Sequence, residues 1–217
     1  MQQLLLKNLC LSSLFITLMI SCSPTHNYTL KRTALVTESD IHSIINKDNS
    51  LLYKAKINVY NHYYSGLILL KQTSPGTSHL VFITELGLKM FDFEIQNNQF
   101  KLIYVFEPLN KPTILSLLEN DMKLILLQNL LHKEAKIFDR NNQDKQIYQT
   151  TNNKLKNYYF INTNTKTVER TIVKGKVFSK EKVNYIYNDS LIAKQIKLKH
   201  KGFIRLKIEL NYLSTKL

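Results

Sequence analysis

The chain is poor in the residues from which most enzyme sites and disulfide frameworks are built. It has two cysteines, five glycines and sixteen acidic residues among 217. Five glycines leave little room for a glycine-rich phosphate loop, and neither a GxSxG elbow nor an HExxH motif occurs. The six histidines are scattered without i,i+4 pairing, as expected of solvated or hydrogen-bonded residues. Asp92 and Glu94 are expected to be exposed sheet residues. The sequence therefore predicts no enzymatic activity, no metal site and no cofactor.

Both cysteines lie in an N-terminal segment that is typical of export. Residues 9–20 form an apolar stretch behind Lys7, shorter than the roughly 20 residues of a membrane-spanning helix. Ser21 then precedes Cys22. This pattern resembles a bacterial lipoprotein signal peptide, which implies that residues 1–21 are removed and that Cys22 receives lipid. The alternatives are an ordinary secretory peptide, or an uncleaved anchor, with an incidental cysteine.

Processing at Cys22 would leave no cysteine for a disulfide or a thiolate metal site, because Cys10 leaves with the signal peptide. We expect a lipidated tether over residues 22–37 and a single β domain over residues 38–217, which is long enough for one core. Two or more acyl chains hold a protein firmly on a bilayer. The membrane is therefore an expected partner through Cys22.

Lysine and arginine outnumber the acids by 30 to 16, which gives a formal net charge of +14. Nucleic acid is not the expected partner, because the lysines are scattered through strands and an exported protein seldom meets nucleic acid. A basic surface favours anionic lipid headgroups, by about 1 kcal/mol for each well-placed Lys or Arg. The positive charge suits a protein held at a membrane surface. We expect the protein to be a monomer.

From about residue 51 the pattern is predominantly β. In the strand expected at residues 89–96, Phe91, Phe93 and Ile95 are expected on one face, with Asp92 and Glu94 on the other. A short helix is also expected over residues 37–46. The strands are expected at residues 53–60, 65–72, 78–86, 89–96, 99–106, 134–138, 146–150, 157–161, 167–173, 182–187, 191–200 and 204–212.

One segment breaks the β pattern. Asn110 is the expected N-cap of a helix whose first turn contains Pro112, where a missing N–H costs nothing. The helix is expected to run to about residue 131 and to be apolar over more than half its circumference. About ten antiparallel strands interrupted by one long apolar helix imply a mainly β (α+β) fold, with a curved sheet wrapped around the helix. The apolar stripe recurs at steps of four, four and three: Ile114, Leu118, Met122 and Ile125.

The inward faces of this fold are expected to be crowded with large apolar side chains. They either fill a dry core or line a half-filled barrel that holds acyl chains, and both interpretations need the same residues. In the second, the expected lining residues are Phe91, Phe93, Phe100, Leu102, Tyr104, Leu118, Met122, Ile125, Ile204, Leu206 and Ile208.

Residues 64–126 carry a family resemblance in TELGLK (84–89), FDFE (91–94) and FEPLNKP (106–112). Together these resemble short outer-membrane lipoproteins of Bacteroidetes, which are distantly similar to the lipoprotein-localisation factors LolA and LolB. The resemblance implies an unclosed antiparallel β-barrel with a helix on its concave face, over a cavity that takes up lipoprotein acyl groups. The protruding hydrophobic loop of LolB-type members would correspond to the turn at residues 72–78.

The sequence thus favours a membrane-anchored, non-enzymatic protein that binds lipid or lipoprotein acyl chains and helps to place them. Ser23 is not an aspartate, and no acidic cluster follows Cys22, so a periplasm-facing position on the outer membrane is expected. The alternative is a structural or accessory lipoprotein that holds a protein partner. That alternative predicts an exposed aromatic patch near residues 63–64 or 158–159.

Overall fold

The computed structural model describes residues 23–45, 50–59, 62–74, 76–140, 143–152, 154–175, 179–201 and 205–214. The expected signal peptide, Cys22 and Ile204 lie outside these residues. Nearly all of the expected β domain lies within them.

The described residues form one sheet of thirteen antiparallel strands. Its order is β1-β7-β8-β9-β10-β11-β12-β13-β2-β3-β4-β5-β6, so β1 and β6 are the edges and the sheet does not close. The expected mainly β, unclosed antiparallel architecture is confirmed, although the strands outnumber the ten expected. Their bounds are β1 Thr29–Leu35, β2 Leu51–Val59, β3 His62–Ser74, β4 Thr77–Thr84, β5 Lys89–Gln96, β6 Gln99–Val105, β7 Glu134–Asp139, β8 Lys145–Asn152, β9 Leu155–Asn162, β10 Thr167–Lys174, β11 Ser179–Tyr187, β12 Ala193–His200 and β13 Leu206–Ser214.

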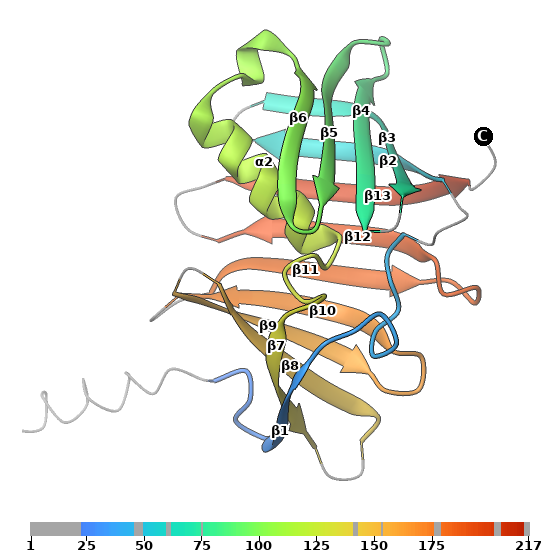
Figure 1. Ribbon diagram of the computed structural model, residues 1–217. Coiled ribbons are helices and arrows are strands. Elements are labelled where there is room, and N and C mark those ends of the chain that lie inside the picture. Colours follow the sequence, from blue (N-terminus) through green and yellow to red (C-terminus); the bar gives the residue numbers. More distant parts are fainter. Residues whose placement is uncertain are drawn as a thin grey trace, which may run out of the picture.

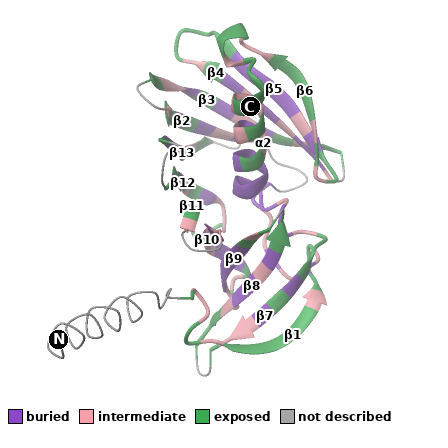
Figure 2. Ribbon diagram, turned by 90° about the vertical axis from the view of Figure 1, so that its left-hand side faces the viewer, coloured by how far each residue is buried: buried purple, intermediate pink, exposed green. Residues whose placement is uncertain are grey.

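Alternating side chains give the sheet its inner face. In β2, Tyr53, Ala55 and Ile57 are buried, whereas Lys54 and Lys56 are exposed. The helix α2 (Pro112–Ile125) crosses the sheet in Figure 1, and Figure 2 shows the β2–β6 half of the sheet curving around it. Most of the buried apolar residues form one core between the helix and the inner face.

The helix begins one residue later than expected and ends several residues earlier. Asn110 is not the N-cap, because its N–H bonds to the carbonyl of Glu107 and closes the short 3-10 helix η1 (Glu107–Leu109). Lys111 is the N-cap, and Pro112 occupies the first turn as expected. The expected continuation to residue 131 is wrong, since Leu127 adopts a left-handed conformation with φ of 60°.

The N-terminal part of the described chain also differs from expectation. Within the expected tether, Thr29–Leu35 form the edge strand β1, and Lys31 makes an ion pair of 2.7 Å with Asp139 of β7. The helix expected over residues 37–46 is absent from their described part, residues 37–45. Instead the N–H and hydroxyl of Thr37 both donate to Asp40 Oδ2, which holds a turn.

Gly66 is the point of closest approach between β3 and β4. A Cβ on this residue would lie 2.1 Å from the carbonyl oxygen of Ile83, a backbone atom that cannot rotate away. We expect Gly66→Ala to lower the free energy of unfolding by about 1–3 kcal/mol, as overpacking usually does. Urea unfolding measures this loss. The exposed Thr73 on the same strand offers a control, since Thr73→Ala should stay within about 0.5 kcal/mol; equal losses in the two variants would contradict the prediction.

Candidate functional site

A cavity of about 720 Å³ lies between α2 and the inner face of the sheet. Its volume is typical of small-molecule sites, which span about 300–1,000 Å³. The walls are mainly apolar. The sheet contributes Ile57, Val59, Phe82, Met90, Phe91 and Leu206, and η1 and α2 contribute Leu109, Ile114, Leu117, Leu118 and Leu124.

The apolar stripe of α2 divides between the cavity and the core. Ile114 and Leu118, in its first half, line the cavity. Met122 and Ile125, near its end, are completely buried in the core. The hydroxyl of Tyr185, from β11, donates to the carbonyls of Leu124 and Ile125 at 3.1 and 3.3 Å. The bond to Ile125 satisfies a carbonyl at the helix end, and both bonds hold that end against the sheet.

Apart from Leu102, Tyr104 and Ile204, the expected lining residues separate into three groups. Phe91, Leu118 and Leu206 line the cavity. Four others do not line it and are buried in the core: Phe93, Met122, Ile125 and Ile208. Phe100 is half-buried and packs against the core.

Leu102 and Tyr104 correct the expectation for β6. Their exposed fractions are 37% and 41%, and neither lines the cavity. β6 is an edge of the sheet, and its register against β5 shifts between Asp92 and Phe93. Leu102 pairs with Phe93 and Tyr104 with Asp92, so the shift prevents both side chains from facing inward. Leu102 is exposed because β6 has no neighbour on its outer side.

Asp92 was also expected to be exposed. Asp92 is buried and accepts hydrogen bonds from His79 Nε2 at 2.7 Å and Lys89 Nζ at 2.9 Å. Although burial opposes the change, these two partners hold the pKa of Asp92 below its ordinary value. The carboxylate of Asp92 is therefore satisfied by His79 and Lys89, and Asp92 does not line the cavity.

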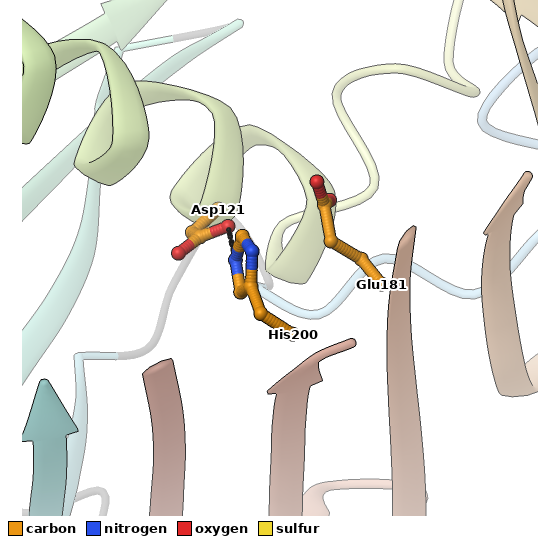
Figure 3. Close-up of side chains that lie close together, drawn as sticks. All are labelled: Asp121, Glu181 and His200. Atoms are coloured by element: carbon orange, nitrogen blue, oxygen red, sulfur yellow. Dashed lines mark hydrogen bonds and ion pairs between the residues drawn. The ribbon is translucent and has the colours of Figure 1, made fainter. Parts of the chain in front are cut away.

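A cluster of two acidic residues and a histidine lies beside the cavity. Asp121 of α2, Glu181 of β11 and His200 of β12 each place a polar atom within 4.8 Å of the others, as Figure 3 shows. Glu181 and His200 line the cavity, and Asp121 is completely buried behind them. The ionised carboxylate of Asp121 can only accept, so His200 Nε2–H donates to Asp121 Oδ1 across 2.8 Å.

Burial dominates the electrostatics of this cluster. It raises the pKa of Asp121, although the hydrogen bond from His200 acts in the opposite direction. Burial also raises the pKa of Glu181, and the nearby charge of Asp121 adds to that rise. Burial alone would lower the pKa of His200, but the hydrogen bond and charge of Asp121 raise it above its ordinary value. The three groups together bind protons more readily than they would in water.

The raised pKa of His200 makes folding stability depend on pH. The folded state holds the His200 proton more tightly than the unfolded state, so this stabilisation is complete below pH 6.5 and is lost as pH rises through the raised value. We expect urea unfolding to show a falling free energy from pH 6.5 to 8.5.

Asp121→Asn should abolish or reverse this slope, because burial, which lowers the pKa of His200, would then be opposed by the charge of Glu181 and no longer by Asp121. Asp92→Asn offers a matched control at the other Asp–His pair and should keep the wild-type slope, since the lowered pKa of Asp92 places its titration in the acid range. An unchanged slope in Asp121→Asn would rule out this account.

Two other sequence expectations concern surface features. The turn at residues 72–78 carries no large apolar side chain, whereas the turn between β4 and β5 exposes 97% of Leu86 and 43% of Leu88. Tyr63 is exposed, but Tyr64 lines the cavity. The aromatic patch expected at residues 158–159 is wrong, because both tyrosines are buried.

Two solved structures are similar to this chain along most of their length. A LolA superfamily protein from Nitrosomonas europaea aligns with a TM-score of 0.53 and 10% identity, over 85% of this chain and 94% of that one. The fold is LolA-like. A domain of an outer membrane lipoprotein-sorting protein from Vibrio parahaemolyticus aligns with a TM-score of 0.44 and 7% identity, over 82% and 87% of the two chains. No family model and no curated protein matches the sequence.

The distant LolA-like resemblance expected from the sequence is thus confirmed at the level of the fold. Within the described residues, no helix is long and apolar enough to cross a membrane.

Proposed function

We propose that the protein is a non-enzymatic, lipid-anchored protein of the outer membrane that binds acyl chains of lipids or lipoproteins and helps to place them. The observation that carries the proposal is the cavity of about 720 Å³ with mainly apolar walls. Each methylene group transferred from water into such surroundings contributes about 0.8 kcal/mol. An acyl chain therefore matches both the volume and the chemistry of the walls.

The fold supports the same proposal. The Nitrosomonas europaea structure belongs to the LolA superfamily, whose best-known members were the basis of the resemblance drawn from the sequence. In this chain the helix α2 supplies one wall of the cavity and the curved sheet the other. The protein would act by holding a chain, not by transforming it, and in the mature form it would face the periplasm.

Filling the cavity should abolish binding. Leu117 lines the cavity from α2, whereas Leu115, on the same helix, does not line it. With residues 23–217, which contain every described element, we expect Leu117→Trp to weaken binding of a fluorescent fatty acid at least tenfold. Leu115→Trp should bind like the wild type. The proposal fails if the wild type takes up no fatty acid in titrations or in native mass spectra after incubation with vesicles.

The anchor is tested separately. We expect the mature N-terminal peptide from membranes to begin at Cys22 and to carry diacylglycerol and an acyl group in its mass spectrum. Cys22→Ser should release no lipidated peptide. An unmodified Cys22 would favour an ordinary secretory peptide and leave acyl binding by the cavity unaffected.

A further inference from the structure

The acidic end of the cavity has more negative charge than its own side chains compensate. Glu181 lines the cavity, and its carboxylate makes no hydrogen bond or ion pair with another described residue. Asp121 uses Oδ1 for His200, while its Oδ2 is buried without a partner. Two carboxylates thus share one imidazole. Uncompensated charge in a low-dielectric site is costly unless an opposite charge or a proton joins it.

Lys180, the exposed neighbour of Glu181 on β11, lowers the pKa of Glu181 less than burial, Asp121 or His200 changes it. Lys111 is the lysine that lines the cavity, and it is exposed at the start of α2. Asp121 follows ten residues later, which places it about 15 Å further along the helix at a rise of 1.5 Å per residue. The cavity therefore has an exposed basic group at one end of α2 and a buried acidic cluster near the other. Because electrostatic attraction is stronger where water is excluded, the buried end should dominate recognition.

Resting on the acyl-chain function proposed above, we infer that the cavity prefers amphiphiles with a primary ammonium headgroup, held by Glu181 and His200. The ammonium group donates to the Glu181 carboxylate, while the alkyl chain extends along the apolar wall of α2. With Nε2–H of His200 committed to Asp121, Nδ1 accepts a second hydrogen bond from the ammonium only when the imidazole has released its other proton.

Figure 3 supports this arrangement, since His200 lies between the two carboxylates. Asp121 acts here as a positioning residue, because it orients the imidazole from behind and does not line the cavity. Burial and the charge of Asp121 raise the pKa of Glu181, although His200 and Lys180 act in the opposite direction. A bound ammonium would add a positive charge beside the two carboxylates.

The test compares headgroups on one alkyl chain. Hexadecylamine, hexadecanol and palmitate compete with an uncharged fluorescent alkyl probe at pH 7.4, with a chelator present so that no divalent ion contributes. We expect hexadecylamine to displace the probe from the wild type at a concentration at least tenfold lower than hexadecanol. In Glu181→Gln the two concentrations should agree within about twofold.

Glu169→Gln is the matched control, because Glu169 pairs with Lys145 on the surface and does not line the cavity. It should keep the preference for the amine. Equal displacement by amine and alcohol in the wild type, or an undiminished preference in Glu181→Gln, overturns the inference and leaves acyl binding intact. If none of the three compounds displaces the probe and the probe itself does not bind, the proposed function fails instead.

Vesicles identify the physiological source of the headgroup. After incubation with equimolar phosphatidylethanolamine and phosphatidylglycerol of identical chains, native mass spectra of the wild type should show mainly phosphatidylethanolamine. Glu181→Gln should take up both lipids equally. Preferential uptake of phosphatidylglycerol by the wild type would contradict the inference and would instead favour headgroup binding at Lys111.

Discussion

Phe93→Ala is expected to lower the free energy of unfolding by about 3–5 kcal/mol, the usual cost of emptying a large aromatic site in a core. Phe93 is completely buried, and its ring centre lies 5.3 Å from that of Phe91 and 4.8 Å from that of Phe100. Removing the ring takes away the contacts that Phe91 and Phe100 make with it. Urea unfolding with a constant m-value would measure the loss.

Leu102→Ala is the matched comparison, because Leu102 pairs directly with Phe93 across the β5–β6 ladder. Its side chain is exposed at the edge of the sheet, so the loss should stay below about 1 kcal/mol. Similar losses in the two variants would show that Leu102 is packed in the core as Phe93 is, and the account of β6 as an exposed edge would then be wrong. Fatty acid binding should survive Phe93→Ala in the folded fraction, because Phe93 does not line the cavity.

The difference in burial between Phe93 and Leu102 shows which features of the sheet the alternation of residues can predict. Alternation correctly predicted that Phe91, Phe93 and Ile95 of β5 share the buried face. It could not predict the register shift between Asp92 and Phe93, because a bulge leaves no trace in composition. Nor could it show that β6 is an edge, since the order of strands in a sheet depends on distant pairings.

The end of α2 is a second feature that the sequence pattern did not predict. Gln128 N–H bonds to the carbonyl of Lys123 and Leu127 N–H to that of Leu124, which together form a Schellman motif. The left-handed residue of that motif is usually glycine, and here it is Leu127. Its side chain is completely buried, and that burial offsets the cost of the backbone conformation, about 1–2 kcal/mol. Without a glycine to mark the end, the leucine run favoured a longer helix.

The cavity illustrates a third limit. The residue types of its walls were predictable, but a filled core and a lined cavity need the same side chains, and only the arrangement of α2 against the sheet separates them. Asp121 and His200 are 79 residues apart in the chain. No local pattern connects them, because their contact depends on where α2 crosses β12. His200 was expected to be solvated or hydrogen-bonded, and the structure shows the second.

His200→Leu is expected to destabilise the protein by about 3–5 kcal/mol at neutral pH, as removal of one partner from a buried ionic pair usually does. Asp121 would keep its buried position with neither oxygen bonded. The carboxyl would respond by holding a proton, so its pKa in the folded state would rise further. By linkage, stability then falls as pH increases through that raised value, and the loss should be larger at pH 8 than at pH 6.

The double variant Asp121→Leu/His200→Leu distinguishes two causes of the lost stability. One is the loss of the Asp121–His200 interaction, and the other is the buried Asp121 carboxylate that remains without a partner. If the cost arises from the uncompensated carboxylate, the double variant should recover more than half of the stability lost in His200→Leu, and its pH dependence should disappear. Urea unfolding of the four members of this cycle at pH 6 and pH 8 provides the measurement. Losses that simply add would mean that the two side chains contribute separately through packing, and the account of a coupled buried pair beside the cavity would then be wrong.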